Sequence, residues 1–181
     1  MEAYFDNKNN VLNANICSTL DSSILYTIKT TFGFLGRKQT ILQDANPISG
    51  GGTVSTVGSI NWEEGTIALG TLKKKFSEVK KHEGSFLKKV RVWQWAPDRK
   101  EFRVRYEDDD WKARNANGDV IGVFSVPYRP HLFRKPKPTT LSVEREALER
   151  DEVFLLLVFV YSEAKRQEQT NSSVGAGSEG F

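Results

Sequence analysis

The chain has 181 residues, of which 38% are hydrophobic and 27% charged, and its formal net charge is +3. This length and composition predict one globular domain whose core needs no disulfide or metal to hold it. The single cysteine, Cys17, excludes an internal disulfide framework, and with two histidines the chain has too few ligands for a Cys/His zinc site. We therefore expect a cytoplasmic protein without metal or cofactor, and so small a net charge does not by itself indicate nucleic-acid binding.

Both ends of the chain are predicted to be poorly ordered. Residues 1–20 are rich in asparagine, show no sustained hydrophobic period and lack the basic start and apolar stretch of a secretory signal. Residues 169–181 consist mostly of small or polar residues, which cannot bury enough surface to order themselves. The expected folded domain therefore spans residues 21–168.

Eight short runs of β-type residues are separated by turn residues, a spacing typical of antiparallel sandwiches and barrels. In one of them, Phe102, Val104 and Tyr106 face one way while arginines face the other, as in a strand with one buried face. Asn117-Gly118 predicts a tight hairpin turn. The runs cover residues 24–31, 39–42, 53–62, 66–69, 90–95, 102–106, 120–126 and 139–143.

The segment 72–82 departs from this strand pattern. Leu72, Phe76 and Val79 recur at the spacing of one face of a helix. We therefore expect a short amphipathic helix near residues 72–82, with a strand as the alternative.

A longer helix is predicted near the C-terminus, over about residues 147–167. This segment lacks Gly and Pro, and it has acidic residues near its start and basic residues near its end, as the helix dipole favours. Within it, residues 153–161 have no polar face, so the helix must be surrounded on every side. Those residues cover roughly 13 Å, against about 30 Å for the hydrocarbon core of a bilayer. We therefore expect a helix buried inside the protein rather than a membrane span.

Six stretches carry a family resemblance, and the most specific are Ile60-x-Trp62 and the helix ending Glu163-Ala164-Lys165-Arg166. They resemble a fungal domain family of unknown function, common in mushroom-forming fungi, which is similar to the tubby C-terminal-like group together with phospholipid scramblases and plant LURP-one-related proteins. The resemblance implies a mainly β fold, a closed antiparallel barrel threaded by a hydrophobic C-terminal helix. The six stretches are residues 24–30, 37–40, 58–62, 102–105, 141–143 and 151–166.

A catalytic or metal site has little support in the sequence. The acidic cluster 107–110 lacks the alternating ligands of an EF-hand, so we expect a solvated loop there and no bound metal. His82 and His131 stand in no nucleophile motif, and Gly-x-Ser-x-Gly is absent. We therefore do not expect an enzyme.

The strongest charge asymmetry is a basic stretch within residues 73–91, whose acidic residues are Glu78 and Glu83. If its side chains converge on one face, they could hold acidic phospholipid head groups, at about 1 kcal/mol for each basic residue near the membrane. An ordinary solvated surface is the alternative. The candidate ligand-binding residues are Lys73, Lys74, Lys75, Lys80, Lys81, Lys88, Lys89 and Arg91.

Two tryptophans, Trp93 and Trp95, share one side of a strand with Arg91. Such a surface could stack the bases of a single-stranded nucleic acid. Aromatic residues at a period of two more often fill the interior of a barrel, so nucleic-acid binding is not favoured.

These features predict a non-catalytic binding module without a transmembrane segment. Its first candidate partner is an anionic phospholipid or membrane surface, which would make the cytoplasmic protein peripheral at membranes. The alternative is a protein-interaction or scaffold domain that does not bind lipid. The lipid hypothesis rests on an analogy at the level of fold.

Overall fold

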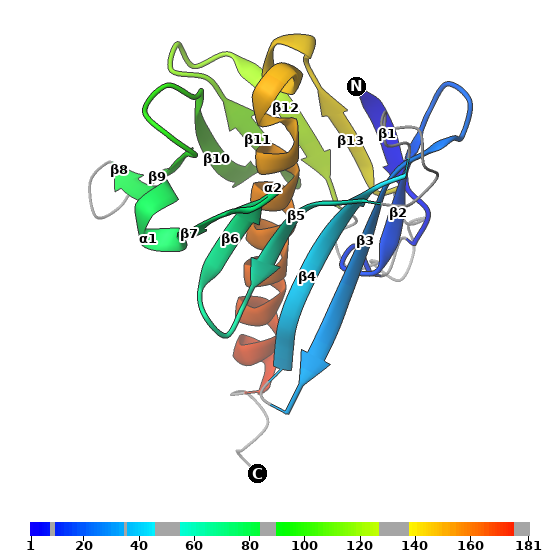
Figure 1. Ribbon diagram of the computed structural model, residues 1–181, viewed down its shortest axis with the longest axis vertical. Helices are drawn as coiled ribbons and strands as arrows, with labels where there is room; N and C mark the ends of the chain where they lie inside the picture. The colour runs from blue at the N-terminus through cyan, green and yellow to red at the C-terminus, as the bar shows by residue number, and fades with distance from the viewer. Residues whose placement is uncertain (8–9, 35, 46–54, 84–89, 127–137, 176–181) are drawn as a thin grey trace.

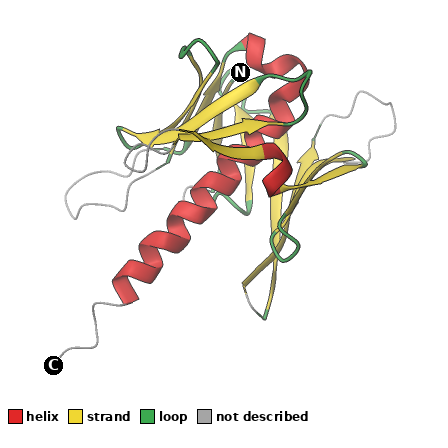
Figure 2. Cartoon of the chain, turned by 90° about the vertical axis from the view of Figure 1, so that its left-hand side faces the viewer, coloured by secondary structure: helices red, strands yellow, loops and turns green. Residues whose placement is uncertain are grey.

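The fold is mainly β, with one antiparallel sheet curled around a long C-terminal helix, α2 (Arg145–Gly175) (Figures 1 and 2). The computed structural model describes all residues except 8–9, 35, 46–54, 84–89, 127–137 and 176–181. The strands of the sheet are β1 (Glu2–Phe5), β2 (Ala14–Ser18), β3 (Ile24–Gly33), β4 (Gly36–Asp44), β5 (Ser55–Asn61), β6 (Thr66–Leu69), β7 (Leu72–Lys75), β8 (Lys80–Glu83), β9 (Val90–Gln94), β10 (Glu101–Glu107), β11 (Asp110–Arg114), β12 (Val120–Ser125) and β13 (Thr140–Val143).

Most neighbouring strands in the sheet are also neighbours in the sequence. The order is β7-β6-β5-β4-β3-β2-β1-β13-β12-β11-β10-β9-β8, so the pairing of β1 with β13 joins the two halves of the chain. In that pair Ala3 lies opposite Leu141, and both side chains are buried. The predicted disorder of residues 1–20 is therefore wrong, because β1 and β2 supply the link between the two halves of the sheet.

The predicted closure of the sheet into a barrel is not confirmed. The sheet is open between its edge strands β7 and β8, which no backbone ladder joins in the described part of the chain. A single helical turn, α1 (Phe76–Val79), connects the two edges, and the ammonium group of Lys74 donates a hydrogen bond to the carbonyl oxygen of Trp95 on the other side. Side chains rather than a backbone ladder therefore bridge this seam.

The segment 72–82 contains both structures that the sequence left open, a short helix and strands. Only Phe76–Val79 is helical, and the residues on either side form β7 and β8. Leu72, which would lie on the apolar face of the predicted helix, is 63% exposed. The helical spacing of three apolar residues was outweighed by the pairing of β7 with β6 and of β8 with β9.

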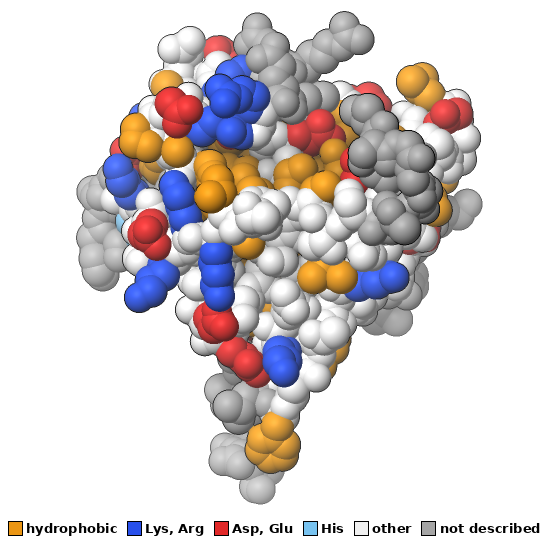
Figure 3. Space-filling view, in the orientation of Figure 1, with side chains coloured by type: hydrophobic (Ala, Val, Ile, Leu, Met, Phe, Trp, Pro, Cys, Tyr) orange, Lys and Arg blue, Asp and Glu red, His pale blue; other side chains and the backbone are white. Residues whose placement is uncertain are grey.

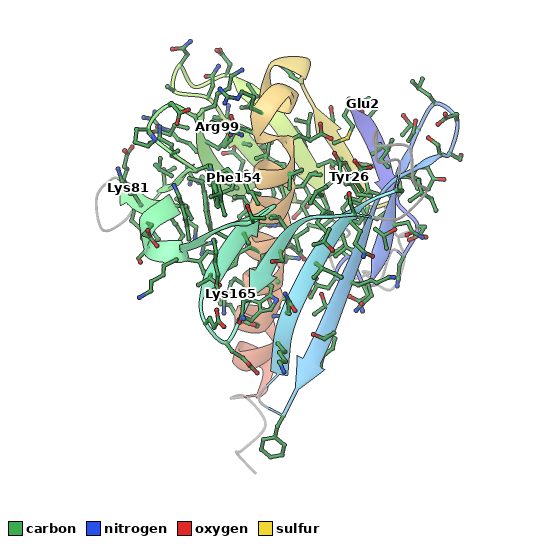
Figure 4. All side chains as sticks on the ribbon, in the orientation of Figure 1. Glu2, Tyr26, Lys81, Arg99, Phe154 and Lys165 are labelled. Carbon is green, nitrogen blue, oxygen red and sulfur yellow. The ribbon has the colours of Figure 1, made fainter. Side chains whose placement is uncertain are left out.

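The predicted buried helix is confirmed. Every residue of α2 from Phe154 to Ala164 is buried, and Phe154 lies on the helix within the curled sheet (Figure 4). The helix begins two residues before the expected position and continues to Gly175, so part of the predicted C-terminal tail is helical. Among the described residues, no helix is both long and apolar enough to cross a bilayer.

All eight predicted β-runs contain strands. In β10 the predicted faces are correct for Phe102, Val104 and Arg105, whereas Tyr106 is only half-buried. Phe102 and Val104 are buried in the core, whereas Arg105 is exposed on the other face. The sequence pattern missed β1, β2 and β11, whereas β7 and β8 lie where a strand was the alternative to a helix.

Two glycines in strands that face α2 provide a matched test of this packing. A Cβ atom added at Gly58 would lie 2.8 Å from Cδ1 of Leu157 and 2.9 Å from Cγ1 of Val153, both on α2. At Gly122 the nearest atom, Cζ of Phe159, would be 3.4 Å away.

We expect Gly58→Ala to lower the free energy of unfolding by about 1–3 kcal/mol, because the core is already filled. Gly122→Ala should be neutral or slightly stabilising. Equal effects in chemical denaturation would contradict this packing.

Candidate functional site

The predicted basic stretch does not form one free basic face. Two of its lysines are held by aromatic groups inside the seam. The ammonium group of Lys80 donates a 3.1 Å hydrogen bond to the hydroxyl of Tyr161 and lies 5.1, 5.5 and 5.8 Å from the ring centroids of Tyr161, Trp93 and Phe76. Lys74 lies over the ring of Trp95 at 4.9 Å. These cation–π contacts commit both lysines to the fold.

The other members of the stretch have separate environments. Lys73 forms an ion pair with Glu64, while Lys75 and Lys81 are exposed. Arg91 is half-buried on β9, and Lys88 and Lys89 lie outside the described residues. On the face seen in Figure 3, basic side chains are interspersed with acidic ones. The convergence on which the sequence-based lipid site depended is therefore not found among the described residues.

The remaining candidates are structural or exposed. Trp93 and Trp95 are buried in the interior of the sheet, so their rings are not exposed for stacking on bases. His82 is exposed on β8, and His131 lies outside the described residues. No group of three or more His, Cys, Asp or Glu side chains in the described part of the chain is placed to hold a metal ion.

The acidic cluster forms the tight turn between β10 and β11. Asp108 and Asp109 adopt positive φ angles of 55° and 65°. The Lys112 ammonium, 2.7 Å from the Asp108 carboxylate, lowers the pKa of that carboxyl, and Glu107 pairs with Arg114. This arrangement matches the solvated loop expected from the sequence.

The clearest exposed apolar feature is the tip of the β3–β4 hairpin. Phe34 is fully exposed and Phe32 is 60% exposed. The hairpin reaches the same end of the molecule as the C-terminal end of α2 (Figure 1). Gly36, with a φ of 114°, provides the backbone conformation that the turn needs. Lys29 and Lys38 are exposed on the same hairpin. We call the segment 29–38 the aromatic hairpin.

A hollow of about 530 Å³ lies beside this hairpin, between it and α2. The guanidinium of Arg37 and the ammonium of Lys165 lie 5.4 and 5.8 Å from the ring centroid of Trp62, and both pair with Glu168. The hollow is lined by Phe32, Gly36, Arg37, Trp62, Lys165 and Glu168.

Trp62 is held firmly at the base of this hollow. Its indole Nε1 donates a 2.9 Å hydrogen bond to the hydroxyl of Thr40, which lies 2.7 Å from that of Thr30. Its ring stacks on Tyr161 of α2, with centroids 5.6 Å apart and planes 7° apart. The hairpin therefore projects from a fixed base.

Sequence reasoning missed the aromatic hairpin. Residues 31–36 read Thr-Phe-Gly-Phe-Leu-Gly, in which large apolar residues stand beside the glycines that mark a turn. Apolar side chains at a turn have no opposing strand to cover them, so this combination was the available signal.

The class of protein that this structure defines is a β-rich domain built from an antiparallel sheet curled around an apolar helix. The chain belongs to the Family of unknown function (DUF6593), whose match covers residues 9–168. No curated protein and no solved structure matches it.

Glu163 of α2 is a buried carboxylate, 1% exposed, that anchors the helix to Trp111 of β11. It accepts hydrogen bonds from Nε1 of Trp111 at 2.9 Å, from Nε and Nη2 of Arg166 at 2.8 Å each, and from Nε2 of Gln167 at 2.9 Å. A buried carboxylate with these donors should contribute strongly to the stability of the folded domain.

We expect Glu163→Gln to lower the free energy of unfolding by about 3–5 kcal/mol, because it removes the carboxylate that binds Arg166 and turns an amide N–H₂ toward N–H donors. Glu168→Gln is the control: it makes the same chemical change at a side chain that is 43% exposed, and should cost less than about 1 kcal/mol. Denaturant unfolding of both variants measures the difference. A similar small loss in both would show that Glu163 is not an anchor.

Proposed function

We propose that this domain is a non-catalytic module that binds the surface of anionic membranes through the aromatic hairpin. The observation that carries the proposal is the exposure of Phe32 and Phe34 at the tip of a projecting hairpin. Full burial of one phenylalanine side chain is worth about 1.5–3 kcal/mol, and insertion into the interfacial region of a bilayer gains part of this.

The charges on the hairpin favour an anionic surface. Lys29 and Lys38 are exposed, and no described residue forms an ion pair with either. Each contributes about 1 kcal/mol near an anionic bilayer. Arg37 and Lys165 add less, because Glu168 already offsets their charge.

This proposal moves the lipid contact away from the basic stretch. Lys81 lies well apart from the hairpin tip (Figure 4), and Lys74 and Lys80 are occupied in the seam. The expected relationship to the tubby C-terminal-like group belongs to the same proposal, as do an absence of catalysis and a cytoplasmic location. A curled antiparallel sheet around an apolar C-terminal helix supports that relationship at the level of fold only.

Co-sedimentation with lipid vesicles tests the proposal. We expect the chain to sediment with vesicles of phosphatidylserine and phosphatidylcholine more than with phosphatidylcholine alone. The double variant F32S/F34S should bind at least about tenfold more weakly, because it loses the free energy that the two phenylalanine side chains gain on entering the bilayer interface. Leu20→Ser is the matched control, since Leu20 is 95% exposed outside the hairpin and should not affect binding.

Charge reversal separates the two candidate lipid surfaces. K29E/K38E should weaken binding to the anionic vesicles only, whereas K73E/K75E/K81E should have a smaller effect. The proposal is wrong if F32S/F34S and L20S bind alike, or if both vesicle types bind equally well. A chain that binds neither vesicle would leave the protein-interaction alternative, with the exposed phenylalanines as the contact.

A further inference from the structure

A second cavity lies against another face of α2, in the β9–β11 part of the sheet, and its wall includes Arg91. Arg91 shares the inward face of β9 with the buried Trp93 and is itself half-buried. No described residue forms an ion pair with its guanidinium. A half-buried guanidinium keeps some contact with water and still has donors that can bind an anion, because its planar fork presents several N–H groups in one direction.

The cavity has a volume of about 230 Å³, equal to roughly seven or eight waters at the density of the liquid. Two of its lining residues, Val104 and Trp111, are 1% and 4% exposed and provide an apolar part of the wall, and the other lining residues are polar or charged. A small molecule rather than a macromolecule fits this space. The lining residues are Arg91, Val104, Arg105, Tyr106, Trp111, Arg166 and Gln169.

Tyr106 offers a hydrogen-bond donor in the same wall. Its hydroxyl is buried and has no hydrogen-bond partner among the described residues. Burial, the largest influence, raises the pKa of Tyr106, with the Asp109, Glu163 and Asp110 charges acting in the same direction and Arg166 opposing them. The hydroxyl therefore stays protonated at neutral pH and can donate. The ring is fixed by an edge contact with Trp111, 5.2 Å between centroids.

On the inward face of β9, Arg91 carries a charge that no described acidic residue compensates through an ion pair. Arg166 lies over the ring of Tyr106 at 4.7 Å, but Glu163 compensates its charge with two hydrogen bonds. Asp109 and Asp110 make the β10–β11 side acidic. The site is thus suited to a small anion bound beside Arg91, and poorly suited to a polyanion.

We propose that this cavity binds a small organic anion, a carboxylate or a phosphate monoester with an apolar body. Arg91 holds the anionic group, because its planar guanidinium can donate two parallel hydrogen bonds to either acid. The hydroxyl of Tyr106 adds one donor, and Trp111 and Val104 cover the apolar body. The inference is independent of the proposed membrane contact, which uses other residues.

Isothermal titration and thermal unfolding of the full chain test this site with four probes of similar shape. Benzoate and phenyl phosphate should bind and raise the melting temperature, while neutral benzyl alcohol and cationic benzylamine should not. Arg91→Gln should weaken binding of both anions by about ten- to a hundredfold, the usual effect of losing a charge-assisted hydrogen bond. Arg103→Gln is the matched control, because it removes the same charge from the outward face of the neighbouring β10.

Tyr106→Phe separates a ligand contact from a structural role. Because no described residue bonds to the hydroxyl, its removal should leave the melting temperature unchanged or higher and still weaken anion binding several-fold. The proposal is overturned if neither anion binds at millimolar concentration, or if Arg91→Gln and Arg103→Gln bind the anions equally.

The anionic group could also belong to a lipid head group, and vesicles distinguish the two sources. Arg91→Gln should sediment with anionic vesicles as well as the unmodified chain does. If it loses vesicle binding instead, the assignment of a soluble ligand is wrong. The F32S/F34S variant should bind benzoate normally, so failure of the membrane proposal and failure of this one give different results.

Discussion

The apolar surface of helix α2 runs around the whole helix, so a flat sheet packed on one side could not cover it. Eleven consecutive residues, Phe154–Ala164, are buried around its whole circumference, so the sheet has to curl until it faces the helix from several sides. Buried carboxylates near the two ends of this stretch fix the position of the helix along its axis. Asp151 accepts a 2.8 Å bond from Nε of Arg99, and Glu163 binds Trp111 and Arg166. The open seam between β7 and β8 is acceptable because Lys74 and Lys80 fill it with side-chain contacts.

The sequence revealed the parts of the fold that depend on local pattern. The apolar run 153–161 predicted the enclosed helix, and the alternation in residues 102–106 predicted a strand with one buried face. The pairing of β1 with β13 was missed, because it joins short segments about 140 residues apart and little in residues 1–20 signals a strand. Residues 72–82 left two structures open for a different reason: three apolar residues at helical spacing can also occur across two short strands and one helical turn.

The candidate sites show where charge counting fails. Lys74 and Lys80 look solvated in the sequence, yet Trp95, Trp93, Phe76 and Tyr161 hold them inside, and those rings come from separate parts of the fold. The aromatic hairpin carried a readable signal, since its phenylalanines stand beside turn glycines. The Arg91 cavity carried none, because its wall is assembled from β9, β10, β11 and α2.

Native-state hydrogen exchange tests the central claim, that the sheet encloses α2, most directly. If it does, the backbone amides of residues 155–164 exchange only when the whole domain unfolds, with protection equal to the global stability and to that of strands β3, β4 and β12. Exchange of these helix amides through local opening, well before the strand amides, would contradict the enclosure on which the rest of the structure depends.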